Sequence, residues 1–328
     1  MAQYLVAGAA GFIAYHVVEQ LLQDGHAVLG FDNLNDAYDV RMKAYRLELL
    51  QRQPGFSFQH LDISDNLQLK SFFDGPPGEA SYAAVINLAA RAGVRQSVEN
   101  PWVYLQTNTT GTLNLLELCR QLKIPKFILA STSSVYGLDA PLPTPETADS
   151  DHPLQAYAAS KKGAEALSHV YHYLYGLDVS VVRYFTVYGP AGRPDMSIFR
   201  FTKWISEGQP LRLNGDGQQT RGFTYVQDIA RGTLLALKPV GYEIINLGGH
   251  ESIKIIDLIH LLEDRIGRKA VIQTQPAHPA DMLANWADVS KATRLLGWEP
   301  RLSIAQGLDK TVAWYNHNRE WASQIETG

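Results

Sequence analysis

Short apolar runs recur along the first half of the chain, and longer stretches with apolar residues at helical spacing lie between them. The short runs predict buried strands at residues 4–7, 27–31, 56–61, 84–88, 127–130 and 179–184. The longer stretches predict helices at residues 12–23, 38–50, 66–73, 101–122 and 155–175. Regular alternation of strand and helix is typical of an α/β protein with a doubly wound parallel sheet.

The pattern changes after about residue 188. Prolines and glycines break the chain into shorter elements there, at Pro190, Gly192, Pro194, Pro210, Gly215 and Gly217. An apolar strand at 244–247, with a helix at 226–237 before it, is expected to return to the first sheet. We therefore predict one domain from residues 1–187 with 226–248 returning to it, and a smaller α/β lobe from 188–225 and 249–328 that ends with a helix at 304–316.

Composition narrows the class of protein. The chain has 328 residues, a formal net charge of −4 and a pI near 6.2, so its charge gives no reason to expect nucleic acid or a membrane surface as a partner.

No segment approaches the roughly 20 apolar residues of a membrane span, and the N-terminus does not have the pattern of a signal peptide. The single cysteine, Cys119, excludes an intramolecular disulfide and fits the cytoplasm. No histidine spacing predicts a metal site.

Glycines stand where the first strand meets the first helix, in Gly8-Ala-Ala-Gly11-Phe12-Ile13. Glycines at such a turn let the backbone approach a pyrophosphate at the helix N-terminus, although the same pattern also occurs in simple tight turns. Asp32 ends the second strand, where a carboxylate can accept hydrogen bonds from a ribose. With no arginine adjacent, this carboxylate favours NAD over NADP; the alternative is a turn or capping role.

Two further strand ends fit a dinucleotide that lies along the edge of the sheet. Asp62 and Ile63 follow the third strand, and Leu88, Ala89 and Ala90 follow the fourth. The small alanines leave room for a cofactor, but close packing of strand against helix explains them equally well.

A possible proton-transfer group lies between residues 131 and 161. Ser131-Thr132-Ser133-Ser134 ends the fifth strand, and Tyr157 and Lys161 share one face of the following helix. The pKa of a phenol is ordinarily about 10. For the phenol to act as a base near neutral pH, this pKa must be lowered by about three units, which requires about 4 kcal/mol. The positive charges of Lys161 and an oxidised nicotinamide can lower it. The alternative is a Tyr/Lys pair on a solvated helix face.

Together these motifs resemble the extended short-chain dehydrogenase/reductases of the NAD-dependent epimerase/dehydratase family, over nearly the whole chain. The resemblance implies that Tyr157 is the catalytic acid/base, that Lys161 is its electrostatic partner and a nicotinamide-ribose ligand, and that Thr132 orients the reacting alcohol. It also assigns Asn33, Asn108 and Tyr184 to the cofactor site, and Val94, Arg95, Ser133 and Ser134 to the substrate site. Where the family has a third glycine and a serine, this chain has Ala14 and Tyr15, which puts the pyrophosphate contacts in question.

The run from Arg183 to Met196 resembles the corresponding run of the UDP-glucuronate 4-epimerases. That resemblance implies that Thr186 and Arg193 hold a sugar carboxylate, for which a planar guanidinium is well suited; the alternative for Arg193 is a surface loop position. Downstream, Arg221 is expected to bind the diphosphate, or else to form an interdomain ion pair. Asp281 is expected near the uridine, although His278 and Ala280 depart from the family pattern there.

The resemblance leaves several reactions open. Decarboxylases of this fold typically carry Glu at the position of Ser134, and dehydratases carry an Asp-Glu pair at Ser133 and Ser134; this chain has neither acid. We therefore predict interconversion of UDP-glucuronate and UDP-galacturonate, through transient oxidation at C4 with bound NAD. Decarboxylation of UDP-glucuronate, epimerisation of another UDP-sugar and a non-catalytic NAD-sensing role are the alternatives. The long helices at 101–122 and 155–175 imply, by the same resemblance, a homodimer.

Overall fold

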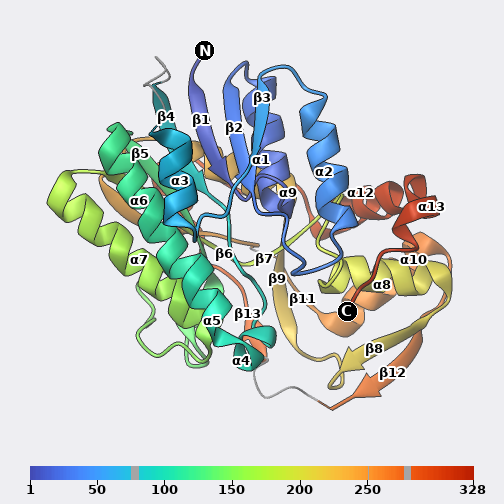
Figure 1. Ribbon diagram of the computed structural model, residues 1–328. Helices are drawn as coiled ribbons and strands as arrows, with labels where there is room; N and C mark the ends of the chain where they lie inside the picture. The colour runs from blue at the N-terminus through green and yellow to red at the C-terminus, as the bar shows by residue number, and fades with distance from the viewer. Residues whose placement is uncertain (75–80, 250, 277–281) are drawn as a thin grey trace.

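A computed structural model describes residues 1–74, 81–249, 251–276 and 282–328. Seven parallel strands form the central sheet in the order β10-β6-β5-β4-β1-β2-β3, with helices on both faces (Figure 1). The strands are β1 (Gln3–Ala7), β2 (Ala27–Asp32), β3 (Phe56–His60), β4 (Tyr82–Asn87), β5 (Lys126–Thr132), β6 (Asp178–Tyr184) and β10 (Tyr242–Leu247). The predicted doubly wound sheet is confirmed, and the strand predicted at 244–247 lies at its edge beside β6.

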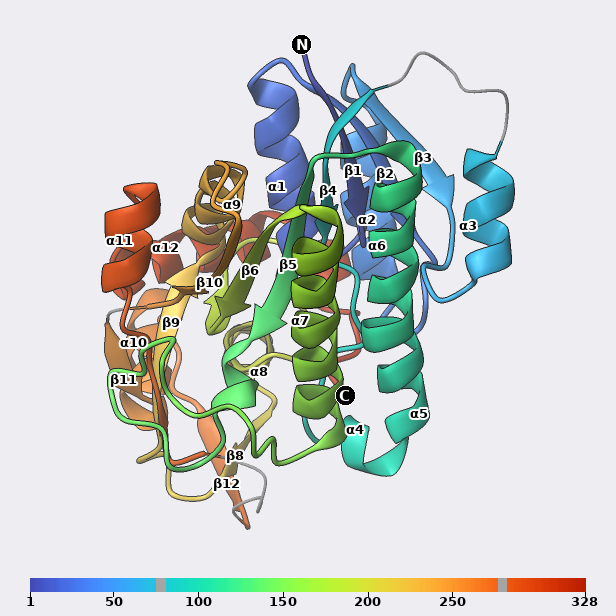
Figure 2. The same ribbon diagram turned by 90° about the vertical axis from the view of Figure 1, so that its left-hand side faces the viewer.

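Each face of the sheet has its own apolar core. On one face lie α1 (Phe12–Gln23), α2 (Arg41–Gln51), α9 (Val226–Leu235) and α11 (Ser290–Leu296). On the other lie α3 (Asn66–Phe73), α6 (Gly111–Leu122) and α7 (Ala156–Tyr175), with α6 and α7 side by side (Figure 2). Alternate residues of the strands point to opposite faces, so Val6 packs against α1 while its neighbours Leu5 and Ala7 pack toward α6. Cys119 is buried in the second of these cores.

The second lobe is built mainly from the chain after β6. It contains β7 (Thr186–Tyr188), α8 (Ser197–Glu207), β8 (Pro210–Asn214), β9 (Thr220–Tyr225), β11 (Ser252–Lys254), α10 (Ile255–Ile266), β12 (Val271–Gln275), β13 (Ala284–Asn285), α12 (Ile304–His317) and α13 (Arg319–Ala322). β9 pairs with β7, β11 and β13, and β8 pairs with β12. The final long helix, α12, packs against α8, α10 and β9, as expected. The exact domain boundaries stay a prediction.

The helix predicted at 101–122 has a different internal structure. After α4 (Gln96–Glu99), it begins as α5 (Pro101–Tyr104), widens into a π-helical segment, η1 (Leu105–Thr110), and continues as α6. Asn100 stands at the N-cap position, but its side chain makes no capping bond. The Thr112 hydroxyl at the start of α6 donates to the carbonyl of Asn108 in the π-helical segment (2.6 Å), which is a backbone oxygen that a regular helix would use. The spacing of apolar residues along the sequence does not predict such a local widening of the helix.

None of the helices in the described part of the chain is long and apolar enough to cross a membrane.

Candidate active site

One large cavity, of about 620 Å³, lies between the carboxyl ends of the central strands and the second lobe. Ligands of open parallel sheets bind at this edge. The cavity brings together nearly all residues that the sequence predicted for the site: Gly8, Gly11, Phe12, Ile13, Asp32, Asn33, Asp62, Ile63, Leu88, Ala89, Ala90, Val94, Arg95, Thr132, Ser133, Ser134, Tyr157, Lys161, Tyr184, Thr186, Arg193 and Arg221. Two predicted residues are not among them. Asp281 lies outside the described residues, and Asn108 does not line the cavity.

Asn108 is fully buried behind the cavity wall. Its amide binds the backbone of Arg91 at both N–H and carbonyl (2.9 and 3.0 Å) and donates to the Ser160 hydroxyl (2.9 Å). It therefore fixes the loop after β4 against the helix that carries Tyr157. A direct contact of Asn108 with a cofactor stays a prediction.

The glycine turn between β1 and α1 is tight. Gly8 has φ +79°, and a Cβ atom there would lie 2.7 Å from Ala89 Cα, so glycine is required both by its conformation and by the close approach of the next strand end. α1 begins at Phe12 without a side-chain cap and without an acidic residue in its first turn. Its N-terminal N–H groups and positive dipole end thus lie at the cavity without an anionic side chain of their own helix.

The two departures from the family pattern differ in their relation to the cavity, since Ala14 is among its lining residues and Tyr15 is not. Ala14 is 1 % exposed and packs in the core between sheet and helices. Tyr15 packs into the same core, and its hydroxyl donates to Glu19 (3.1 Å). The bulk of Tyr15 is accommodated inside the protein and does not occupy the cavity.

Asp32 is buried at the end of β2, where its carboxylate accepts a hydrogen bond from the Leu34 N–H (2.8 Å). Lys43 on α2 lies with Nζ 3.5 Å from Asp32 Oδ1 and also lines the cavity. The sequence prediction considered only cations adjacent to Asp32 along the chain and missed Lys43. Beside them, the Asp62 carboxylate accepts hydrogen bonds from Asn33 (2.8 Å) and Ser64 (2.6 Å). Burial raises its pKa, but these hydrogen bonds outweigh burial, and the pKa is lowered overall.

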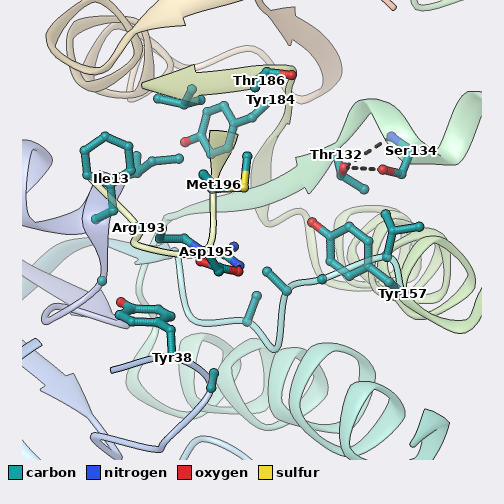
Figure 3. Close-up of a pocket in the computed structure, with 18 of the residues that line it drawn as sticks. Ile13, Tyr38, Thr132, Ser134, Tyr157, Tyr184, Thr186, Arg193, Asp195 and Met196 are labelled. Atoms are coloured by element: carbon teal, nitrogen blue, oxygen red, sulfur yellow. Dashed lines mark hydrogen bonds and ion pairs between the residues drawn. The ribbon is translucent and has the colours of Figure 1, made fainter. Parts of the chain in front are cut away.

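Thr132 and Tyr157 lie in the same cavity (Figure 3), and Lys161 lines it as well, as the sequence predicted. The Thr132 hydroxyl interacts with the Ser134 hydroxyl and with the Ser134 N–H, both at 3.2 Å. Lys161 Nζ donates to the Ala130 carbonyl at the end of β5 (2.9 Å). The helical spacing of Tyr157 and Lys161 on α7 and the adjacent end of β5 thus bring a phenol, an ammonium and a hydroxyl to one region.

Burial raises the pKa of the Tyr157 phenol, while a hydrogen bond to Thr132 and the positive charge of Arg193 oppose that rise. Burial lowers the pKa of Lys161 to about 8, against the opposing charge of Glu165. In the protein alone, therefore, the phenol is not yet a base at neutral pH, and an additional positive charge is needed beside it.

A buried ion pair supports this corner from behind. Arg183 on β6 donates to both oxygens of Glu165 on α7 (2.9 and 2.6 Å), and the Ser131 hydroxyl donates to the same carboxylate (2.5 Å). The Arg183 guanidinium also lies over the Tyr136 ring at 4.7 Å. Glu165 is one helical turn beyond Lys161, so a charged pair with almost no solvent exposure holds α7 against β5 and β6.

Arg193 lies in the middle of the cavity, with Tyr38 on one side and Tyr157 on the other (Figure 3). Its Nε and Nη2 atoms bind the two carboxylate oxygens of Asp195 at 3.1 and 2.5 Å, and its guanidinium lies 5.7 Å from the centre of the Tyr38 ring. Thr186 on β7 lines the same cavity. Neither Tyr38 nor Asp195 was predicted as a site residue, and the Arg-x-Asp spacing is the one sequence signal that points to Asp195.

The remaining predicted substrate residues surround the side of the cavity formed by the second lobe. Ser133 accepts a hydrogen bond from Asn285 (3.0 Å), which ties the end of β5 to β13. Arg221 donates to the carbonyls of Thr220 (2.9 Å) and Met282 (2.6 Å). The cavity therefore lies across both lobes, and cationic side chains line it from both, Arg95 from the first and Arg200, Arg212 and Arg221 from the second.

The profile of the NAD-dependent epimerase/dehydratase family matches residues 4–248. The chain belongs to this family. It is 56% identical over 327 residues to the UDP-glucuronate 4-epimerase of Thermodesulfobacterium geofontis, covering 99% of this chain and 100% of that protein. The family predicted from the motifs is thereby confirmed.

Solved structures of family members share the fold. The UDP-glucuronic acid 4-epimerase of Bacillus cereus, in complex with UDP-glucuronic acid and NAD, is 36% identical, with a TM-score of 0.88 and coverage of 96% of this chain and 99% of that one. A UDP-glucose 4-epimerase of Thermotoga maritima is 31% identical with a TM-score of 0.88, covering 97% and 99%. Family members with different sugar substrates thus share this architecture, so the substrate must be argued from the side chains of the site.

Proposed function

We propose that this protein interconverts UDP-glucuronate and UDP-galacturonate by transient oxidation at C4 of the sugar. The observation that carries the proposal is Arg193 in the same cavity as Tyr157, close enough for its charge to oppose the rise that burial causes in the pKa of the phenol. A guanidinium beside the proton-transfer group provides a partner for a carboxylate next to the reacting carbon. The 56% identity to a UDP-glucuronate 4-epimerase supports the same substrate.

The residues present fit NAD as the cofactor. Gly8 leaves no space for a Cβ beside Ala89, and the uncapped N-terminus of α1 offers N–H groups to a pyrophosphate. Asp32 offers a buried carboxylate to the ribose hydroxyls at the end of β2. Around these we propose contacts from Phe12, Ile13, Asn33, Asp62, Ile63, Leu88, Ala89, Ala90 and Tyr184, all of which line the cavity. Bound NAD supplies a hydride acceptor whose reduced form returns the hydride, and so no external oxidant is needed.

In the proposed mechanism, Tyr157 takes the proton of the sugar's 4-hydroxyl and returns it after the ring has turned over in the cavity. Thr132 orients the reacting oxygen. Lys161 holds a positive charge near the phenol while its Nζ is anchored to the Ala130 carbonyl. Burial raises the pKa of Tyr157. The positive charges of Arg193, Lys161 and an oxidised nicotinamide must therefore lower it.

The oxidised sugar is a β-keto acid, which can lose carbon dioxide. An epimerase must therefore hold the carboxylate in a position from which it does not leave as carbon dioxide. We propose that Arg193 and Thr186 hold the carboxylate, that Arg95, Val94, Ser133 and Ser134 contact the sugar and that Arg221 binds the diphosphate. Asp281 stays a proposed uridine contact. No carboxylic acid stands at 133 or 134, where decarboxylases and dehydratases of this fold carry one.

The test is to incubate the purified protein with UDP-glucuronate and to follow the sugar signals by NMR. UDP-galacturonate is the expected product. A UDP-pentose with released carbon dioxide would establish the decarboxylase alternative, and no turnover would favour the NAD-sensing alternative. UDP-glucose serves as the matched substrate without a carboxylate, and preferential turnover of it would assign the protein to another class of UDP-sugar epimerase.

We also propose that the protein is a homodimer formed through α5, η1, α6 and α7. Trp102 on α5 and Tyr173 on α7 are 72 % and 78 % exposed, and Leu105 on η1 and Val170 on α7 are exposed as well. Apolar side chains gathered on two adjacent helices are suited to a second copy of the same surface. Sedimentation should give a dimer, and Trp102→Glu should give a monomer; a monomeric parent protein would contradict the proposal.

We further propose a cytoplasmic location, because the only cysteine is a buried free thiol. Fractionation of the native host with an antibody against the protein tests this.

A further inference from the structure

Arg46 on α2 is completely buried, yet it lies outside the residues that line the cavity. Nothing in the proposed chemistry uses it. A fully buried guanidinium is costly unless its donors are bound, so its partners indicate what it does.

Four hydrogen bonds from Arg46 reach three separate segments. Nε donates to the Ala191 carbonyl (2.9 Å), and Nη2 donates to the Gly192 carbonyl (3.1 Å). Nη1 donates to the Ala10 carbonyl (3.1 Å) and to the Tyr38 hydroxyl (2.9 Å). No carboxylate is among these partners. The charge is instead surrounded by carbonyl dipoles and by the rings of Phe12 and Tyr38, at 5.9 and 5.6 Å.

Two of these partners immediately precede Arg193 in the chain. The turn that leads to Arg193 has an unusual backbone, with Ala191 at φ +53° and Gly189 at φ +152°. A non-glycine residue in the left-handed region is strained and needs outside support. Arg46 provides it at Ala191 and Gly192, and His16 Nε2 lies 3.2 Å from the Pro190 carbonyl.

Another of these partners, Tyr38, connects Arg46 to the guanidinium of Arg193 itself. Tyr38 is held at its hydroxyl by Arg46 and presents its ring to Arg193 at 5.7 Å. Arg46 thus acts on Arg193 along two routes, through the backbone before it and through the ring beside it.

We propose that Arg46 is a positioning residue that sets the place of Arg193 in the cavity and couples the carboxylate-binding turn to the glycine turn. This inference rests on the proposed function, in which Arg193 holds the uronate. A lysine at position 46 keeps the charge but lacks the planar fork, and so it cannot bind the Ala191, Gly192 and Ala10 carbonyls together.

The experiment compares Arg46→Lys, Arg46→Met and Tyr38→Phe with the parent protein. We expect Arg46→Lys to raise the KM for UDP-glucuronate about tenfold and Arg46→Met more, because misplacement of a charge-assisted contact costs about 1.4 kcal/mol or more. The inhibition constant of UDP, which has no sugar carboxylate, should change less than about twofold, or about 0.4 kcal/mol. Tyr38→Phe, which removes one of the four bonds, should shift KM in the same direction by a smaller factor.

Lys126→Met is the matched control, since it removes another buried cation at the opposite end of the sheet, where Lys126 binds the Asp178 carboxylate, the Ser180 hydroxyl and the Lys238 carbonyl. It should lower the melting temperature and leave KM unchanged. Equal rises in the UDP-glucuronate KM and the UDP inhibition constant, or a fall in melting temperature with unchanged KM for all Arg46 variants, would overturn the proposal. If the parent protein does not turn over UDP-glucuronate, the proposed function fails. In that case, calorimetry compares how the Arg46 variants and the parent protein bind UDP-glucuronate and UDP, and this tests Arg46 without turnover.

Discussion

The guanidinium of Arg193 and the carboxylate of Asp195 form a two-point ion pair inside the cavity, with Nε–Oδ1 at 3.1 Å and Nη2–Oδ2 at 2.5 Å. The pair occupies one edge of the guanidinium and leaves Nη1 for another acceptor. A positive side chain in the site is thereby held in place by a negative one two residues away, without a substrate. Asp195 orients the group that we assign to the uronate.

Replacing Arg193 by alanine should weaken binding of UDP-glucuronate about 100-fold, because a charge-assisted hydrogen bond contributes about 1.5–3 kcal/mol. UDP should bind as before, since it carries no sugar carboxylate. Calorimetric titration of both ligands measures the difference. Asp195→Asn, which keeps one hydrogen bond to Arg193, is the control and should weaken UDP-glucuronate binding by a smaller factor. Equal weakening of UDP and UDP-glucuronate in Arg193→Ala would remove the carboxylate assignment.

Tyr157→Phe removes the phenolic oxygen and keeps the ring, which packs edge-on near Tyr104 at 6.1 Å. We expect kcat to fall about 1000-fold or more, within the range that general acid/base groups contribute. NAD content of the purified protein should stay the same, as measured by absorbance after denaturation. A variant that loses NAD while the NAD-loaded fraction keeps its turnover rate would show that Tyr157 has a binding role only.

Lys161 gives the site a defined pH dependence. Burial lowers its pKa to about 8, so the ammonium is present below that pH and is lost as the pH rises through it. Loss of the ammonium removes a charge that favours the phenolate, and so kcat should decline above about pH 8.

Lys161→Arg tests this assignment, because a guanidinium stays charged throughout that range. Its kcat should be lower, since a guanidinium is larger than an ammonium, but the decline above pH 8 should be absent from its profile. A decline with the same midpoint in Lys161→Arg would assign it to another group.

The local features of this site were predictable, and the long-range ones were not. The glycine turn follows from adjacent residues, and the shared face of Tyr157 and Lys161 follows from helical spacing. Both can be seen in the sequence because the residues lie close together along the chain. The contacts of Arg46 join α2 to a turn about 145 residues away, and Lys43 reaches Asp32 across the start of α2. No regular spacing of residues in the sequence predicts either of these contacts. Both depend on the sheet order, which places the ends of distant strands together.

The buried pair of Arg183 and Glu165 should matter for stability more than any surface pair. Their side chains are 1% and 3% exposed, and removing one partner leaves a buried charge alone. We expect Glu165→Gln to lower the free energy of unfolding by about 3–5 kcal/mol. Urea denaturation measures it. The exposed pair of Arg52 and Glu48 is the matched control, and Glu48→Gln should cost less than about 1 kcal/mol. The double variant Arg183→Met with Glu165→Met should recover much of the loss; no recovery would mean that the pair's shape, and not its charge balance, stabilises the fold.

Cofactor choice should depend on Asp32 and Lys43 together. Lys43 Nζ lies 3.5 Å from Asp32 Oδ1 and 3.2 Å from Asn35 Oδ1, so its charge is engaged by the carboxylate that repels a 2′-phosphate. In Asp32→Ser, Lys43 loses that partner and can pair with the phosphate of NADP. We expect the preference for NAD over NADP to fall about 100-fold, about 2.7 kcal/mol, in titrations of cofactor-depleted protein. Adding Lys43→Met to Asp32→Ser should abolish the gain for NADP. If the double variant binds NADP as well as Asp32→Ser does, Lys43 is not the cation that receives the phosphate, and loss of repulsion from Asp32 alone explains the change.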